Sequence, residues 1–236
     1  MQRYFASING NQIILSKDDA FHLLKVMRAK IGEEILAISD EKLYLGKVIS
    51  LNPLVIENKG EASEASRELE VKTTLFFSLA KGDKIDFVIQ KATELGVKEI
   101  VLVKTERSIV KLTDDDFNRK LTRYSLIAKE ASEQCARRTI PTISYLTSMA
   151  SIPSEFLSEI NYVAYEEDAF NKVSFLDAKD KKSVSIFIGP EGGLSEQEVD
   201  TLVKQGFQRV SLGKRILRTE TAAVAALAMI NMVVEK

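Results

Sequence analysis

The chain has 236 residues, of which 45% are hydrophobic, and its 33 Lys and Arg oppose 34 Asp and Glu for a net charge of −1. This length can bury one large core or two modest ones, and the balanced charge excludes a globally basic nucleic-acid binder. The single cysteine, Cys135, excludes an internal disulfide framework, and one cysteine with one histidine argues against a zinc site, so no metal is predicted.

The amino-terminal third predicts a small β-barrel with one helix. Short apolar runs predict strands at residues 12–15, 34–38 and 43–51, and residues 18–29 have the apolar spacing of a helix. Residues 57–70 are rich in glutamate and nearly free of apolar side chains, which predicts a linker or a long loop. We therefore expect two domains, residues 1–70 and 71–236.

Strands and helices are then predicted to alternate. Strands are expected at residues 72–79, 98–103, 161–165, 184–188 and 208–212. Helices are expected from Asp83 to near Gly96, from Thr113 to near Arg138, and from Ser195 towards Gly206. Cys135 falls on the apolar stripe of the second helix, which argues against a nucleophilic role. The alternation predicts an α/β fold with a mostly parallel sheet and helices on both faces.

The carboxyl-terminal segment, residues 222–234, is apolar except for Asn231. Its 13 residues are too few to span a bilayer, so it predicts a buried helix, with Glu220 near the positive end of the helix dipole. No secretory signal is visible at the amino terminus. The sequence therefore predicts a cytoplasmic protein that is not a membrane protein.

Two loops are expected to carry the function. The run Gly-Pro-Glu-Gly-Gly (189–193) follows one predicted strand, and the run Leu-Gly-Lys-Arg-Ile-Leu-Arg-Thr-Glu-Thr (212–221) follows another. Loops at the carboxyl ends of strands are where open α/β sheets bind ligands. The glycine spacing matches neither a dinucleotide-binding fingerprint nor a phosphate-binding P-loop. Considered alone, the first loop is explained equally well as a tight turn into a helix capped by Ser195 and Glu198.

The second loop belongs to a locally basic segment. Residues 204–218 contain five cations and no acid. A basic patch of this kind can bind phosphates on an otherwise neutral protein, and a solvated surface is the alternative interpretation.

Together the two loops resemble the signature of the RsmE family, 16S rRNA uridine N3-methyltransferases of the SPOUT, or α/β-knot, superfamily. The resemblance extends to residues 90–97, to Glu106-Arg107-Ser108 with Lys111, and to residues 133–137, where Ala136 stands at a position often held by glycine. Arg3-Tyr4-Phe5 and residues 22–28 resemble the family's amino-terminal domain. The similarity covers nearly the whole chain.

This resemblance implies a SPOUT trefoil-knot methyltransferase domain preceded by a PUA-like barrel, and a homodimer. It implies S-adenosylmethionine as the cofactor and N3 of a specific uridine of 16S rRNA in the small ribosomal subunit, position 1498 in the family's substrate, as the target. The cofactor residues that it implies come from three loops: Ala164, Tyr165, Glu166, Ile188, Gly189, Pro190, Gly192, Leu212, Gly213, Leu217 and Thr219.

The implied chemistry needs a cationic environment. Uridine N3 is a weakly acidic imide that must lose its proton before it attacks a sulfonium methyl group, and fixed charges and alignment stabilise that step. Arg218 is the first catalytic candidate. Glu133 and Arg137, four residues apart on the predicted helix, form either a catalytic pair or a surface salt bridge. No proton acceptor is assigned, and Glu133, Glu94 and bulk water all stay open for this role.

Contacts with RNA are expected from cations in both domains, and the target base must be exposed or flipped to reach N3. The candidates are Arg3, His22, Lys25, Arg28, Arg107, Lys111, Lys214 and Arg215. His22 has a structural role as its alternative. Two other functions stay open: a SPOUT enzyme acting on tRNA or on a ribose 2′-hydroxyl, and a non-catalytic RNA-binding module.

Overall fold

The computed structural model describes residues 1–110, 112–168 and 174–235. The chain forms two compact units. Met1–Glu68 and Ser132–Thr139 make up the first, and Leu69–Ala131 with Ile140–Lys236 make up the second. The division into functional domains at residue 70 stays a prediction.

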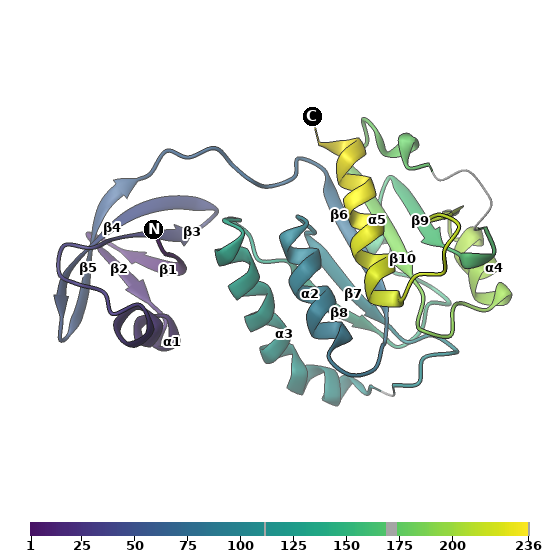
Figure 1. Ribbon diagram of the computed structural model, residues 1–236, viewed down its shortest axis with the longest axis horizontal. Helices are drawn as coiled ribbons and strands as arrows, with labels where there is room; N and C mark the ends of the chain where they lie inside the picture. The colour runs from purple at the N-terminus through teal and green to yellow at the C-terminus, as the bar shows by residue number, and fades with distance from the viewer. Residues whose placement is uncertain (111, 169–173, 236) are drawn as a thin grey trace. The chain divides into compact units, whose positions relative to one another are not determined.

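The first unit contains a closed five-stranded barrel in the order β1-β2-β5-β4-β3 (Figure 1). The strands are β1 (Arg3–Asn9), β2 (Gln12–Leu15), β3 (Glu34–Ser39), β4 (Lys42–Leu51) and β5 (Leu54–Glu61). Strand β1 pairs parallel with β3 and closes the barrel. Ile13, Ile35 and Ile56 fill the interior. A side chain at Gly46 would lie only 2.7 Å from Ile13 Cδ1, so glycine lets the barrel walls approach.

One expectation for this unit was wrong, and another was confirmed only in part. Residues 57–61 belong to strand β5, where Lys59 pairs with Glu57 and Lys42 pairs with Glu61, so the polar composition reflects an exposed barrel strand and the linker begins later. The helix expected at 18–29 is an α-helix, α1 (Lys17–Phe21), that continues as a π-helical turn, η1 (His22–Val26). The backbone then turns sharply at Arg28, which has a φ of 54°.

The second unit is built on a six-stranded, wholly parallel sheet in the order β11-β9-β10-β6-β7-β8. The strands are β6 (Lys72–Ser78), β7 (Glu99–Val103), β8 (Thr142–Leu146), β9 (Ile160–Ala164), β10 (Ser183–Ile188) and β11 (Phe207–Val210). The sequence-based prediction included all of these except β8, which confirms the parallel α/β architecture.

Helices cover both faces of this sheet. Helices α2 (Lys84–Glu94), α3 (Asp114–Gln134) and α5 (Thr219–Val234) lie on one face, and α4 (Glu196–Lys204) lies on the other (Figure 1). Short 3-10 turns occur at η2 (Ser154–Phe156), η3 (Glu166–Asp168) and η4 (Leu176–Ala178). Side chains alternate along β6: Leu75 and Phe77 join the core under α2 and α5, whereas Phe76 joins the core under α4. The strands are therefore buried on both faces, as parallel strands normally are.

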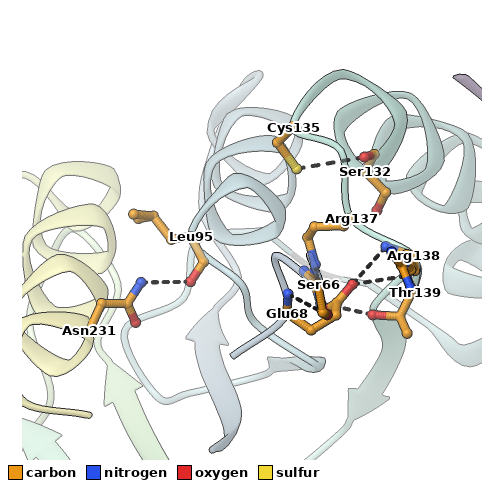
Figure 2. Close-up of polar contacts among 9 residues, drawn as sticks. All are labelled: Ser66, Glu68, Leu95, Ser132, Cys135, Arg137, Arg138, Thr139 and Asn231. Carbon is orange, nitrogen blue, oxygen red and sulfur yellow. Dashed lines mark hydrogen bonds and ion pairs between the residues drawn. The ribbon is translucent and has the colours of Figure 1, made fainter. Parts of the chain in front are cut away.

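Helix α5 is apolar because much of it faces this core. Ala223, Leu227 and Ile230 are fully buried. Its one amide side chain, Asn231, donates to the Leu95 carbonyl at 2.9 Å and joins α5 to the end of α2 (Figure 2). No helix in the described ranges is long and apolar enough to cross a membrane.

The long helix α3 ends four residues earlier than the position expected near Arg138. It stops at Gln134, and Ala136 adopts a left-handed conformation with a φ of 64°. This conformation explains why glycine suits that position, since glycine adopts it without steric cost. Arg137 lies beyond the helix, so the expectation that Glu133 and Arg137 share one helix face was wrong.

Both residues instead contact the framework of the first unit. Arg137 is buried, and its guanidinium donates to Glu68 Oε2 at 2.9 Å, while Glu68 Oε1 accepts the backbone N–H groups of Arg138 and Thr139 (Figure 2). Burial opposes ionisation of Glu68, but these hydrogen bonds outweigh it and lower its pKa. Glu133 Oε1 accepts the Phe5 N–H at 2.9 Å. These contacts give Glu133 and Arg137 a structural role, and we do not propose a catalytic role for either residue.

Candidate functional site

A cavity of about 440 Å³ lies within the second unit, at the carboxyl ends of β9, β10 and β11. These strands are neighbours in the sheet, so the segments that follow them meet at one edge. Every residue of the implied cofactor set except Gly192 lines this cavity. The lining also includes Lys84, Glu191, Gly193, Ser211, Arg215, Ile216, Arg218 and Ala222. Its volume is typical of sites for small molecules and cofactors.

The first loop, Gly189–Gly193, is folded tightly by its glycines. Gly193 has a φ of 68°, and a side chain there would meet Glu166 Oε1 at 2.1 Å. Its N–H donates to the Pro190 carbonyl at 2.9 Å. Thr219 Oγ1, at the start of α5, donates to the Gly189 carbonyl at 2.6 Å. These contacts fix one wall of the cavity and bring the Glu166 carboxylate against it.

Gly192 faces away from the cavity lining. A side chain at this position would meet Arg107 Cβ at 3.3 Å, and Arg107 Nη1 donates to the Gly192 carbonyl at 3.0 Å. The glycine lets the loop pack against the segment that follows β7. Its role as a cofactor contact, implied by the family resemblance, has no support in this geometry.

The helix after this loop begins as predicted. Ser195 and Glu198 form the capping box, and Ser195 Oγ also donates to Glu106 Oε2 at 2.9 Å. Glu198 Oε1 accepts the Glu106 N–H at 2.7 Å. The amino-terminal cap of α4, the first loop and the segment that follows β7 therefore stabilise one another.

Lys84, at the start of α2, joins both sides of the cavity. Its ammonium lies 2.9 Å from Glu191 Oε1 in the first loop and 3.4 Å from Glu220 Oε2 in α5. The hydrogen bond to Glu191 raises the pKa of Lys84. Burial would raise the pKa of Glu191, but the hydrogen bond from Lys84 outweighs burial and lowers it. Nothing in the sequence around Lys84 indicates this position, because the three elements meet only in the folded chain.

The second loop presents cations to solvent beside the cavity. Arg215 and Arg218 line the cavity and are exposed, Ile216 is 86% exposed, and Lys214 is exposed on the turn. Arg218 is the residue that precedes the first turn of α5, and its side chain makes no capping hydrogen bond. In β11, the strand before this loop, the Arg209 guanidinium carbon lies 4.9 Å from the centre of the Tyr165 ring. Burial raises the pKa of Tyr165, which stays a neutral wall of the cavity.

The remaining candidates for RNA contacts belong to the barrel unit or lie outside the described residues. Arg3 is paired with Glu64 at 2.7 Å, and His22 Nδ1 lies 2.9 Å from the Tyr4 hydroxyl. Lys25 and Arg28 are exposed, and Lys111 lies outside the described residues. Burial and nearby carboxylates raise the pKa of Tyr4 to about 12, so its hydroxyl stays neutral. Among the residues described, no group of three metal-ligating side chains occurs.

Comparison with known proteins gives consistent results for both units. Residues 67–231 match the family model of an RNA methyltransferase domain, and residues 15–56 match that of an RNA methyltransferase PUA domain. The chain is 36% identical over 251 residues to the ribosomal RNA small subunit methyltransferase E of Bacillus subtilis, covering 98% of this chain and 96% of that protein.

Solved structures agree over the same length. A methyltransferase of Legionella pneumophila in complex with the cofactor SAM is 29% identical, with a TM-score of 0.87, and the match covers 98% of this chain and 96% of that one. The ribosomal RNA small subunit methyltransferase E of Neisseria gonorrhoeae, bound to S-adenosyl methionine, is 30% identical with a TM-score of 0.84, over 99% and 98% of the two chains. The expected fold, a SPOUT domain with a PUA-like barrel, is confirmed. The chain belongs to the ribosomal RNA small subunit methyltransferase E (RsmE) family of RNA methyltransferases.

Proposed function

We propose that this protein transfers the methyl group of S-adenosylmethionine to N3 of a uridine in the 16S rRNA of the small ribosomal subunit. The observation that carries the proposal is the cavity at the ends of β9, β10 and β11, with Arg215 and Arg218 in its lining. Relatives whose solved structures hold this cofactor share the fold over nearly the whole chain. A cytoplasmic location, where ribosomal subunits are found, is part of the proposal.

The residues of the cavity fit the cofactor chemically. Ile188, Leu212 and Leu217 provide apolar surface for an adenine ring. The Glu166 carboxylate, held beside Gly193, suits an ammonium group or ribose hydroxyls. The missing side chain at Gly193 leaves the backbone close to the space that the cofactor would fill. When bound, the cofactor would supply a methyl group activated by a sulfonium.

The chain's own residues would then align and stabilise the reaction. Arg218 lies between the cavity and solvent, where its fixed positive charge would stabilise the uracil anion as N3 loses its proton. The apolar lining would exclude water from the sulfonium. The described contacts single out no proton acceptor, so the proton is assigned to solvent. Lys214 and Arg215 would bind rRNA phosphates on the same loop.

The product distinguishes this proposal from its rivals. The purified protein is incubated with the donor and with small ribosomal subunits that lack the modification, and the rRNA nucleosides are analysed by mass spectrometry. We expect N3-methyluridine. A 2′-O-methyl nucleoside as the only product, or methylation of tRNA alone, would assign the protein to another SPOUT activity. Binding of rRNA with no methyl transfer would support the non-catalytic module.

The proposal includes a homodimer formed through α5. On this helix Met232 is 85% exposed and Ala228 is also exposed, so apolar side chains remain uncovered after the core is packed. Light scattering at micromolar concentration should give twice the chain mass of 26.4 kDa. Replacing Met232 by Glu should shift that mass to the monomer, and a monomer mass for the unmodified chain would refute the dimer.

A further inference from the structure

The helical segment of the barrel unit carries an exposed aromatic residue that the cavity chemistry does not use. Phe21 is 61% exposed and Val26 is 59% exposed, whereas Leu23 on the opposite side is fully buried. Asp19 is buried, and its carboxylate accepts a hydrogen bond from Ser16 Oγ. One side of α1 and η1 is therefore anchored in the barrel, and the other presents a large apolar surface to solvent.

Cations flank this aromatic residue at helical spacing. Lys17 and Lys25 lie four residues before and after Phe21, and both are exposed. Residues four apart share one face of an α-helix, and the wider π-helical turn keeps Lys25 close to that face, so both lysines lie on the side of the segment that presents Phe21. The π-helical turn is closed by the hydrogen bond from the Met27 N–H to the His22 carbonyl, and this wider turn brings Val26 onto the same side as Lys25.

The backbone around this surface is costly to form. A π-helical turn is rare, and Arg28 is a non-glycine residue with a φ of 54°. Such features persist only where the surrounding structure enforces them, and they are common at functional sites. Here they end the helix so that Arg28 is exposed close behind Lys25.

We propose that Phe21 is a stacking platform for an unpaired base of the RNA substrate, with Lys17 and Lys25 binding the phosphates on either side. A flat apolar side chain between cations matches a single-stranded nucleotide, whose base has an aromatic face and whose backbone is anionic. Between residues 17 and 30 the exposed charges are four cations, Lys17, Lys25, Arg28 and Lys30, against Asp18 alone. This inference rests on the proposed function, and it adds the recognition of an unpaired nucleotide by the barrel.

The chain contains no tryptophan, which provides a direct test. Phe21→Trp introduces a single fluorescent reporter that remains able to stack. Ile14→Trp is the matched control, since Ile14 is an exposed apolar residue of the same barrel, 47% exposed, and the residues two positions away in the chain, Gln12 and Ser16, are uncharged. Each full-length variant is titrated with a single-stranded RNA oligonucleotide, with the same sequence in a duplex, with small ribosomal subunits and with anionic lipid vesicles.

We expect single-stranded RNA and subunits to quench the fluorescence of the Phe21→Trp variant and to leave that of the Ile14→Trp variant unchanged, with a weaker response to the duplex. Phe21→Ala and Phe21→Leu should both weaken single-strand binding by about 5- to 150-fold, the loss expected for one stacked base. Leucine should not rescue, because it is apolar but has no ring to stack. Lys25→Ala should lower the salt dependence of binding.

Three results would overturn the platform: RNA that binds the Phe21→Trp variant without quenching it, quenching of that variant by vesicles and not by RNA, or full affinity in Phe21→Leu. The methylation assay is independent of these signals. If the unmodified protein transfers no methyl group while RNA still quenches the Phe21→Trp variant, the proposed function fails and the platform stands. If methylation proceeds and the fluorescence of that variant does not respond, the platform fails and the function stands.

Discussion

The two loops that line the cavity are held in different ways. In the first loop, Gly189 accepts from Thr219, Glu191 pairs with Lys84, and Gly192 accepts from Arg107. In the second loop, Lys214, Arg215, Ile216 and Arg218 all extend into solvent.

This difference matches two kinds of ligand. A small cofactor is bound more tightly when its contacts are fixed in advance, because less side-chain and loop freedom is lost on binding. A large polyanion is attracted by exposed charge and completes its contacts as it docks. We therefore assign the first loop, together with the apolar residues of the second, to the cofactor, and the exposed cations of the second loop to the RNA and the reacting base. Substitutions in and beside the two loops test that assignment.

The largest effect is expected at Arg218. Replacing Arg218 by Ala should lower the rate of methyl transfer at saturating RNA by about 10²-fold, as for other fixed groups that stabilise developing charge. Single-turnover assays measure this rate directly, and Arg218→Lys should recover part of it. A variant that loses only RNA affinity, with its saturated rate intact, would move Arg218 into the phosphate-binding group.

The next effect separates two adjacent glycines of the first loop. Gly193→Ala places a side chain at a φ of 68° and against Glu166, so the empty loop should relax away from this conformation. Restoring the conformation on binding costs about 1–2 kcal/mol, so cofactor affinity should fall by about 5- to 30-fold. Gly192→Ala is the matched control, since its new methyl group would face Arg107 outside the lining. Titration calorimetry with S-adenosylmethionine should show little change for it. An equal loss of cofactor affinity in the two variants would show that Gly193 is no closer to the cofactor than Gly192.

A smaller effect is expected at Lys84. Replacing Lys84 by Met removes the cation that joins Glu191 to Glu220. Cofactor affinity should fall by about two- to fivefold, the usual range for a partly exposed ion pair, and Lys84→Arg should restore most of it. A fall in the saturated rate with no change in cofactor affinity would place Lys84 in the chemical step instead.

The pH range of the Lys84 effect follows from the two pKa shifts. The pKa of Glu191 is lowered from 4.5, so the ion pair with Lys84 stabilises the folded protein fully above pH 4.5. This stabilisation is lost as pH falls through the lower pKa of the folded state. The pKa of Lys84 is raised from 10.5, so the same ion pair stabilises the folded protein fully below pH 10.5. This stabilisation is lost as pH rises through the higher pKa of the folded state. The difference in the free energy of unfolding between Lys84→Met and the unmodified protein, measured by urea denaturation, should therefore be constant from pH 4.5 to 10.5. A gradient near neutral pH would implicate another group.

The smallest effect is expected at Lys214 on the second loop. Replacing Lys214 by Ala should reduce the slope of log affinity against log salt by about 0.7–0.9, the change expected for one lost phosphate contact, and should leave the saturated rate unchanged. Filter binding over a salt series measures the slope. An unchanged slope would mean that Lys214 is a solvated surface residue.

Local sequence patterns predicted the second unit well. The capping box at Ser195 and the strands that precede each loop were confirmed, because they depend on neighbouring residues. The strand composition of the barrel was less informative. Residues 57–61 look like a linker because β5 exposes polar side chains there, and β1 was missed, as was β8 in the second unit.

The ends of helices were also difficult to predict. Helix α3 stops before Ala136 although the apolar stripe includes Cys135, and Arg137 is buried against Glu68, 69 residues earlier in the chain. A salt bridge between such distant positions leaves no local pattern. The sequence also does not predict which way Gly192 faces, because its contact is with Arg107, 85 residues away in the chain.

Motif spacing and hydrophobic periodicity are properties of neighbouring residues, so the family, the alternation of strands and helices, and the two loops could be predicted from the sequence. The folded chain was needed to show which residues of those loops line the cavity, that Lys84 pairs with Glu191 and Glu220 across it, and that Phe21 is exposed close to cations. These features arise where segments distant in the chain meet and where one face of a helix remains uncovered. Both depend on how each unit packs and not on any local pattern.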